Sequence, residues 1–180
     1  MSAIGQNVRT TLIGRTIAAG AIAGMIAGAG MAMYAMVASA TFLGQGFFTP
    51  LYGIASPIVG QTAMMTSMKQ GLYFNLGPAL VGLAGHMMWS AMFGIAFGLI
   101  ARAAQLRGMM SVVAGVGFGL VIQIVMSLVV LPVLGLGSMP GTIGLPSFTV
   151  EHVLFGMMLG LWVVVRPRDV SVVTVHGVHP

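Results

Sequence analysis

The sequence predicts an all-α integral membrane protein in which four transmembrane helices form a tandem duplication of a two-helix unit. Of its 180 residues, 58% are hydrophobic and 5% are charged, whereas a soluble domain carries about 25% charged residues. The mean hydropathy is +1.04. Apolar residues gather in four stretches, each long enough to cross about 30 Å of hydrocarbon, which takes roughly 20 helical residues. A histidine pattern recurs in the second and fourth stretches.

The four predicted spans are Thr16–Ala40, Ala79–Ala101, Gly108–Leu131 and Phe148–Val165. They should be helices, because backbone polar groups in lipid must be satisfied within the segment. They are apolar on every side, whereas barrel strands alternate polar and apolar residues. The first stretch follows two arginines, as a signal peptide would, but it exceeds the roughly 7–15 apolar residues of such a peptide. We therefore expect it to be an uncleaved first span.

The basic residues predict the orientation of the chain. The formal net charge is +5 and the sequence pI is about 10.9. Six of the seven basic residues would lie on one side of the membrane, and Lys69 on the other; the six are Arg9, Arg15, Arg102, Arg107, Arg166 and Arg168. The positive-inside rule then places both termini in the cytoplasm of a bacterial inner (plasma) membrane. This topology accounts for the basic charge, so we expect lipid and other membrane subunits as partners, and no nucleic acid.

The chain divides into a first repeat at 15–102, a second repeat at 107–166 and a cytoplasmic tail at 167–180. Each repeat holds a glycine-rich helix, an outer loop with proline and glycine, and a histidine helix. Two spans per repeat give both repeats the same orientation, related by an axis along the membrane normal. The loop at 41–78 is long, and we expect it to fold back on the bundle or to meet another subunit.

The first and third spans are rich in glycine: Gly20, Gly24, Gly28 and Gly30 lie in one, and Gly115, Gly117 and Gly119 in the other. Small residues at a spacing of four let helix backbones approach closely. Helix packing is therefore the favoured interpretation. The alternative is that these residues leave space for a flat cofactor.

Two histidines carry the repeated pattern, each with a small residue four places later and a glycine eight places later. The residues are His86, Ser90 and Gly94 in the second span, and His152, Gly156 and Gly160 in the fourth. Positions 0, +4 and +8 share one face of a helix. Both histidines should lie in the outer half of the bundle, in a polar layer with Gln123 and Glu151. Either residue could orient an imidazole by a hydrogen bond to its ring. Alternatively, Glu151 could simply complement the dipole at the start of its helix.

Several chemistries fit this layer. A b-type haem or another tetrapyrrole could be held between His86 and His152, with the small residues making room for the ring. The imidazoles could instead serve as interhelical hydrogen-bond glue, bind copper, or form part of a proton or substrate path.

A second candidate copper site uses thioether sulfur, which favours Cu(I). It consists of Met64, Met65 and Met68 in the first outer loop. The other methionines should act as adaptable apolar fillers. His176 and His179 in the tail lack a third ligand, so we expect a solvated tail.

No cysteine is present, which excludes disulfides and thiol catalysis. The sequence also has no constellation of nucleophile and base, so we do not expect an enzyme. The chain resembles a loose group of uncharacterised bacterial four-helix membrane proteins with paired histidine-helix motifs. The resemblance rests on His152, Gly156 and Gly160, the parallel His86 and Gly94, and the four-span layout; Ser90 stands where a glycine is expected. It implies the fold and brings no established activity. We therefore expect a non-catalytic subunit or accessory protein of a larger membrane complex.

Overall fold

The computed structural model describes residues 3–165, with side chains for residues 12–141 and 144–165. This part of the chain is helical and contains no strand. The four long elements are α1 (Ala3–Thr41), α4 (Leu76–Ala103), α5 (Met109–Val125) with its continuation to residue 133, and α8 (Leu145–Val165). All four are long and apolar enough to cross a membrane. The predicted all-helical architecture with four candidate spans is therefore confirmed.

Prolines explain why two of these helices begin three residues earlier than predicted. α4 begins at Leu76 and α8 at Leu145, so Pro78 and Pro146 lie in the first turns. Proline is tolerated there because the N–H groups of the first turn have no acceptor within the helix, so a residue without an N–H loses no hydrogen bond. The apolar runs alone could not place these ends, because the first turn continues the composition of the loop before it.

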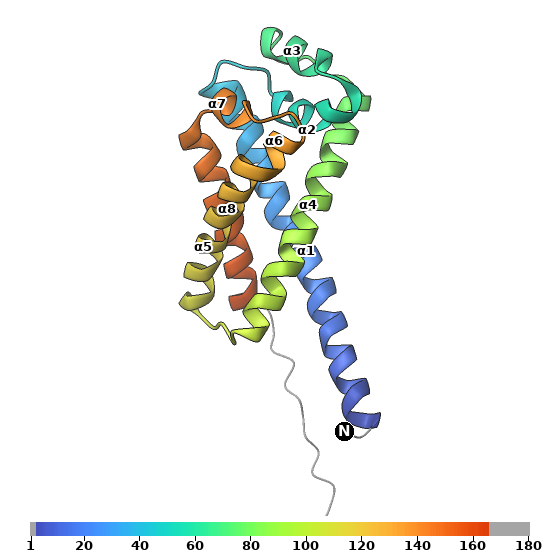
Figure 1. Cartoon of the computed structure of the whole chain (residues 1–180). Coiled ribbons are helices and arrows are strands. Elements are labelled where there is room, and N and C mark those ends of the chain that lie inside the picture. Colours follow the sequence, from blue (N-terminus) through green and yellow to red (C-terminus); the bar gives the residue numbers. More distant parts are fainter. Residues whose placement is uncertain (1–2, 166–180) are drawn as a thin grey trace, which may run out of the picture.

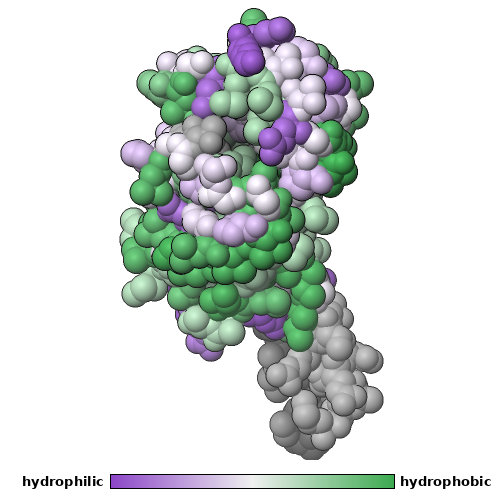
Figure 2. Space-filling view, turned by 45° about the horizontal axis from the view of Figure 1, so that its top comes forward, coloured by the Kyte–Doolittle hydropathy of each residue, from purple (hydrophilic) through white to green (hydrophobic). Residues whose placement is uncertain are grey.

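The long helices pack as two pairs (Figure 1). α1 lies against α4, α5 lies against α8, and the two pairs meet mainly through α1 and α8. One end of the bundle carries a cap of shorter helices, namely α2 (Thr49–Val59), α3 (Thr62–Lys69), α6 (Leu131–Val133) and α7 (Met139–Ile143). Figure 2 shows hydrophobic residues around the bundle below this cap, and more hydrophilic ones on the cap itself.

The segment between α1 and α4 folds back on the bundle. Its helix α2 packs against α4 and α1, with the Tyr52 side chain buried at 1% exposure. The Tyr52 hydroxyl accepts a hydrogen bond from the Asn75 backbone N–H (2.8 Å). Thr49 Oγ1 also donates to Ser67 Oγ of α3 (3.0 Å). The long outer loop is thus a packed cap with a small core of its own.

Glycines bring the backbones of both helix pairs together. A Cβ placed on Gly24 would lie 2.9 Å from Gly94 Cα, and one on Gly115 would lie 3.1 Å from Gly160 Cα. Real Cβ atoms do not approach another backbone this closely without displacing it. The glycine stripes of α1 and α5 therefore serve helix packing, as the favoured sequence interpretation predicts.

A matched pair of substitutions on α5 tests this packing. A Cβ on Gly119 would overlap the His152 carbonyl oxygen, whereas a Cβ on Gly117 would have no atom within 4 Å. We expect Gly119→Ala to lower the free energy of unfolding by about 1–3 kcal/mol, the usual cost of overpacking. Gly117→Ala should be neutral or slightly stabilising, because alanine favours helix by up to about 1 kcal/mol. Thermal unfolding in detergent measures both, and equal shifts would contradict the packing role.

A π-helical turn, η1 (Met126–Val130), separates α5 from α6. Pro132 explains its position, because proline lacks the N–H for the helical bond to residue i−4 and its ring clashes with that carbonyl. The Leu131 N–H bonds instead to the Met126 carbonyl, five residues back. Wider turns of this kind often occur at functional sites, and Met126 lies at the candidate site described next.

Candidate metal site between the four long helices

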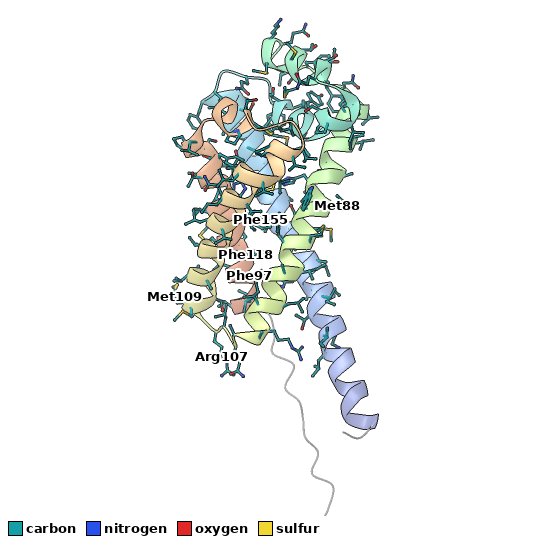
Figure 3. All side chains as sticks on the ribbon, in the orientation of Figure 1. Met88, Phe97, Arg107, Met109, Phe118 and Phe155 are labelled. Atoms are coloured by element: carbon teal, nitrogen blue, oxygen red, sulfur yellow. The ribbon has the colours of Figure 1, made fainter. Side chains whose placement is uncertain are left out.

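His86 and His152 line one cavity of about 60 Å³ between the helices. The structure thus brings together the two histidines that the sequence pattern paired. The cavity is also lined by Met31 and Met126, so that α1, α4, the π turn and α8 each contribute one side chain with a metal-binding atom. Aromatic side chains, including Phe155, form other parts of the wall. Phe155 lies in the interior of the bundle above Phe118 and Phe97 (Figure 3).

His86 is held by the neighbouring helix. Its Nε2 donates a hydrogen bond to the Gly28 carbonyl oxygen of α1 (2.9 Å). A carbonyl oxygen can only accept, so Nε2 carries the ring proton. In the neutral imidazole the other nitrogen, Nδ1, then has a free lone pair. A Cβ on Gly28 would lie 3.5 Å from His86 Nε2, so the glycine lets the ring reach the backbone of α1.

His152 is held by its own helix. Its Nδ1 donates to the Phe148 carbonyl one turn earlier (2.8 Å), and the Phe148 ring packs edge-on against it with centroids 4.4 Å apart. The residue is buried, at 3% exposure. By the same reasoning Nε2 is the nitrogen with the free lone pair. Metal-binding histidines in proteins commonly donate their other N–H to a backbone carbonyl in this way.

Met31 and Met126, whose side chains carry thioether sulfur, line the same cavity. Met31 lies on α1, and Met126 opens the π turn that precedes Pro132. Both side chains are partly buried and pack against the main hydrophobic core. The sequence predicts both as apolar fillers, because neither spacing nor composition distinguishes them from the other methionines. Only the π turn, which Pro132 could have signalled, marks the region of Met126.

The small residues of the repeated pattern do not leave open space beside the histidines. A Cβ on Gly94 would meet the backbones of Gly20 and Gly24, and one on Gly160 would meet those of Ser111 and Val112. Ser90 and Gly156 likewise lie against Gly28 and Gly115. In this conformation neighbouring helices fill the volume that a flat macrocycle would require.

The predicted orienting residues make no hydrogen bond to either histidine. Gln123 Nε2 donates to Thr149 Oγ1 (2.8 Å), which ties α5 to α8. Glu151 is 3% exposed, and its Oε1 has no hydrogen-bond partner in the described part of the chain. Backbone carbonyls take the orienting role instead, because they lie within reach of the ring N–H groups.

The outer methionines lie elsewhere, on α3 in the cap. Met64 packs against Tyr52 and its neighbours, whereas Met65 is 52% exposed. Met68 is partly buried. None of the three lines the histidine cavity. His176, His179 and the rest of the predicted tail lie outside the described residues.

Comparisons of the chain with protein-family models, with curated proteins and with solved structures find no match. The geometry of the site therefore carries the functional inference.

Proposed function

We propose that the chain is a multi-pass protein of the bacterial inner membrane, and that it acts as a non-catalytic accessory subunit binding one Cu(I) ion between its four long helices. The observation that carries the proposal is the cavity itself. Two histidines, each with one ring N–H already bonded to a carbonyl, and two methionines line a space of about 60 Å³.

The membrane location is supported by the four apolar helices, and the orientation by the basic residues. Arg102 lies in the last turn of α4, and Arg107 lies in the connection to α5, at the end of the bundle opposite the cap (Figure 3). Lys69 ends α3 in the cap. This asymmetry favours a cytoplasmic arginine end and an external cap. Both termini would then be cytoplasmic.

The packing of the two helix pairs supports a tandem duplication. Ser90 and Gly156 are each the fourth residue after their histidine. A Cβ on Gly24 would meet the Ser90 carbonyl, and a Cβ on Gly115 would meet the Gly156 carbonyl. The two pairs thus cross at corresponding positions of the repeated pattern. The histidines differ in their partners, since His86 bonds across to α1 and His152 bonds within α8.

The donor set favours Cu(I) over divalent ions. Thioether sulfur is a soft ligand suited to Cu(I), and imidazole binds copper well. All four donors are neutral, and the idealised cost of moving a single charge into an apolar medium is already of order 20 kcal/mol. That cost rises with the square of the charge, so a monovalent ion enters such a site more readily.

The volume favours an ion over the predicted haem. Clefts for organic ligands typically span about 300–1,000 Å³, several times the 60 Å³ found here. A tetrapyrrole between His86 and His152 would have to displace side chains that line the cavity from both helix pairs, such as Phe93 and Phe155. The remaining alternative fills the space with one or a few waters bonded to the free ring nitrogens, which would leave the histidines a structural role.

Exposed apolar side chains on the cap support a place in a larger complex. Phe42 is 80% exposed, Ile58 is 78% exposed and Leu72 is 83% exposed. They lie between or at the ends of the cap helices, outside the long apolar spans. Other membrane subunits would cover such residues.

Titration of the purified full-length protein in mild detergent tests the function. We expect one Cu(I) per chain when the protein competes anaerobically with a chromogenic chelator, and no comparable uptake of Zn(II). Preparations from cells grown with added haem precursor should show no Soret absorbance. A Soret band would favour the tetrapyrrole instead, and absence of both signals would leave the histidines as packing residues.

A further inference from the structure

We infer that a second cavity, at the arginine end of the bundle, binds the phosphate of an anionic phospholipid and holds part of its acyl chain. This cavity has a volume of about 390 Å³ and is lined by α1, α4, α8 and the connection from α4 to α5. It is larger than the histidine cavity and contains none of its residues. The inference is therefore independent of copper binding.

Three arginines line this cavity: Arg15, Arg102 and Arg107. Among the described residues no acidic side chain lines it, and their single acidic residue, Glu151, lies near the opposite end of α8. Eleven residues separate Glu151 from Trp162 of the cavity wall, or about 17 Å along the helix. The mouth is thus strongly cationic and complements an anion.

The hydrogen bonds of Arg102 leave its charge available. Its Nη1 donates to the Leu12 carbonyl (2.9 Å) and to Thr16 Oγ1 (3.0 Å). Both acceptors are neutral, so they fix the guanidinium on α1 without cancelling its charge. Guanidinium carries five N–H donors in a planar fork that matches a phosphate group. Arg107 makes no hydrogen bond to the described part of the chain. Its side chain is exposed at the lower end of the bundle (Figure 3).

Another donor in the wall lacks a partner. Trp162 Nε1 is buried and makes no hydrogen bond within the described residues, and Trp162 lines the cavity. A buried N–H without an acceptor loses the hydrogen bond that it would make to water. Indole N–H groups are also common at the headgroup level of membranes. A phosphate or glycerol oxygen in the cavity would supply the missing acceptor.

The inner wall of the cavity is apolar, which favours a lipid over free phosphate. Ala23, Phe97 and Leu159 line it and are at most 5% exposed. The lining on α1 extends from Leu12 to Ala23, about 17 Å along the helix. A cationic mouth above an apolar interior matches an amphiphile with an anionic head. Basic pockets between transmembrane helices on the cytoplasmic side are known to hold such headgroups.

The test measures lipid affinity of the full-length protein in neutral detergent by native mass spectrometry. The ligands are phosphatidylglycerol, phosphatidylcholine of the same chains, and inorganic phosphate. We expect phosphatidylglycerol to bind at least about tenfold more tightly than phosphatidylcholine. Arg102→Gln with Arg107→Gln should weaken phosphatidylglycerol binding about 25-fold at low salt, given about a fivefold contribution per arginine. Lys69→Gln, at the cap, should leave it unchanged.

Thermal unfolding without lipid checks that the double variant is folded, and Arg107→Gln alone serves if Arg102→Gln disturbs its bonds to α1. Equal affinity for the two lipids, or an equal loss in Lys69→Gln, would overturn the inference. Displacement of phosphatidylglycerol by millimolar inorganic phosphate would assign the arginines to free phosphate and overturn the lipid assignment. Copper uptake should be the same in all these variants. A negative result for lipid binding can therefore be distinguished from a negative result for copper binding.

Discussion

Replacing His152 by leucine is expected to lower the affinity of the protein for Cu(I) at least about 100-fold, and His86→Leu should have an equal effect. Loss of the hydrogen bond that orients a metal ligand already lowers metal affinity about 10–100-fold. Loss of the ligand itself should lower it by at least as much. The double variant should show no Cu(I) uptake in competition with the chelator. The measurement is the chelator titration of each variant in the same detergent.

The variants should remain folded. His86→Leu removes one interhelical hydrogen bond to Gly28, and such bonds are worth about 0.6–2 kcal/mol in membrane proteins. The bond of His152 lies within α8, so its loss does not separate helices. Trp89→Phe is the matched control, because Trp89 lines the same cavity. The nitrogen of its neutral indole has no lone pair available for copper. Unchanged Cu(I) affinity in the double histidine variant would contradict the proposed site.

Replacing both cavity methionines, Met31→Leu with Met126→Leu, is expected to weaken Cu(I) binding about tenfold or more and to reduce the preference for Cu(I) over Zn(II). Thioethers bind Cu(I) well and Zn(II) poorly. Their loss should therefore reduce the preference for Cu(I) over Zn(II) more than it reduces metal binding as such. Methionine and leucine have similar volumes, and such exchanges usually cost less than about 1.5 kcal/mol of stability. The measurement is a pair of titrations, one with each metal.

The outer methionines provide the control for this prediction. Met64→Leu with Met68→Leu changes two thioethers on α3, and neither lines the histidine cavity. We expect unchanged Cu(I) affinity in that variant. A loss confined to the α3 variant would place copper in the cap, in agreement with the alternative that the sequence offered, and would remove the metal from the histidine cavity.

Most of the fold could be predicted from the sequence, because a membrane span depends on length and apolar composition more than on any individual residue. The predicted Thr16–Ala40 falls within α1, and Ala79–Ala101 within α4. The cap was harder to predict. Its short helix α2 packs on α4, and α3 packs on α2, around the buried ring of Tyr52; no local pattern reveals these contacts.

The candidate site was predictable only in part. His86 and His152 stand out because ionisable side chains are rare in such spans, and their spacing pairs them. Met31 and Met126 were indistinguishable among 17 methionines. The role of the small residues was also open, because the same glycine can make room for a cofactor or for a helix backbone. The three-dimensional contacts of Gly94 and Gly160 decide in favour of the backbone.

X-ray absorption at the copper edge, on the Cu(I)-loaded full-length protein, tests the central claim most directly. We predict a mixed shell of two imidazole nitrogens and two thioether sulfurs around one Cu(I) per chain, with the sulfur contribution lost in Met31→Leu with Met126→Leu. A shell of light atoms alone in the intact protein, or a sulfur contribution that persists in this double variant, would contradict a copper site between the four helices.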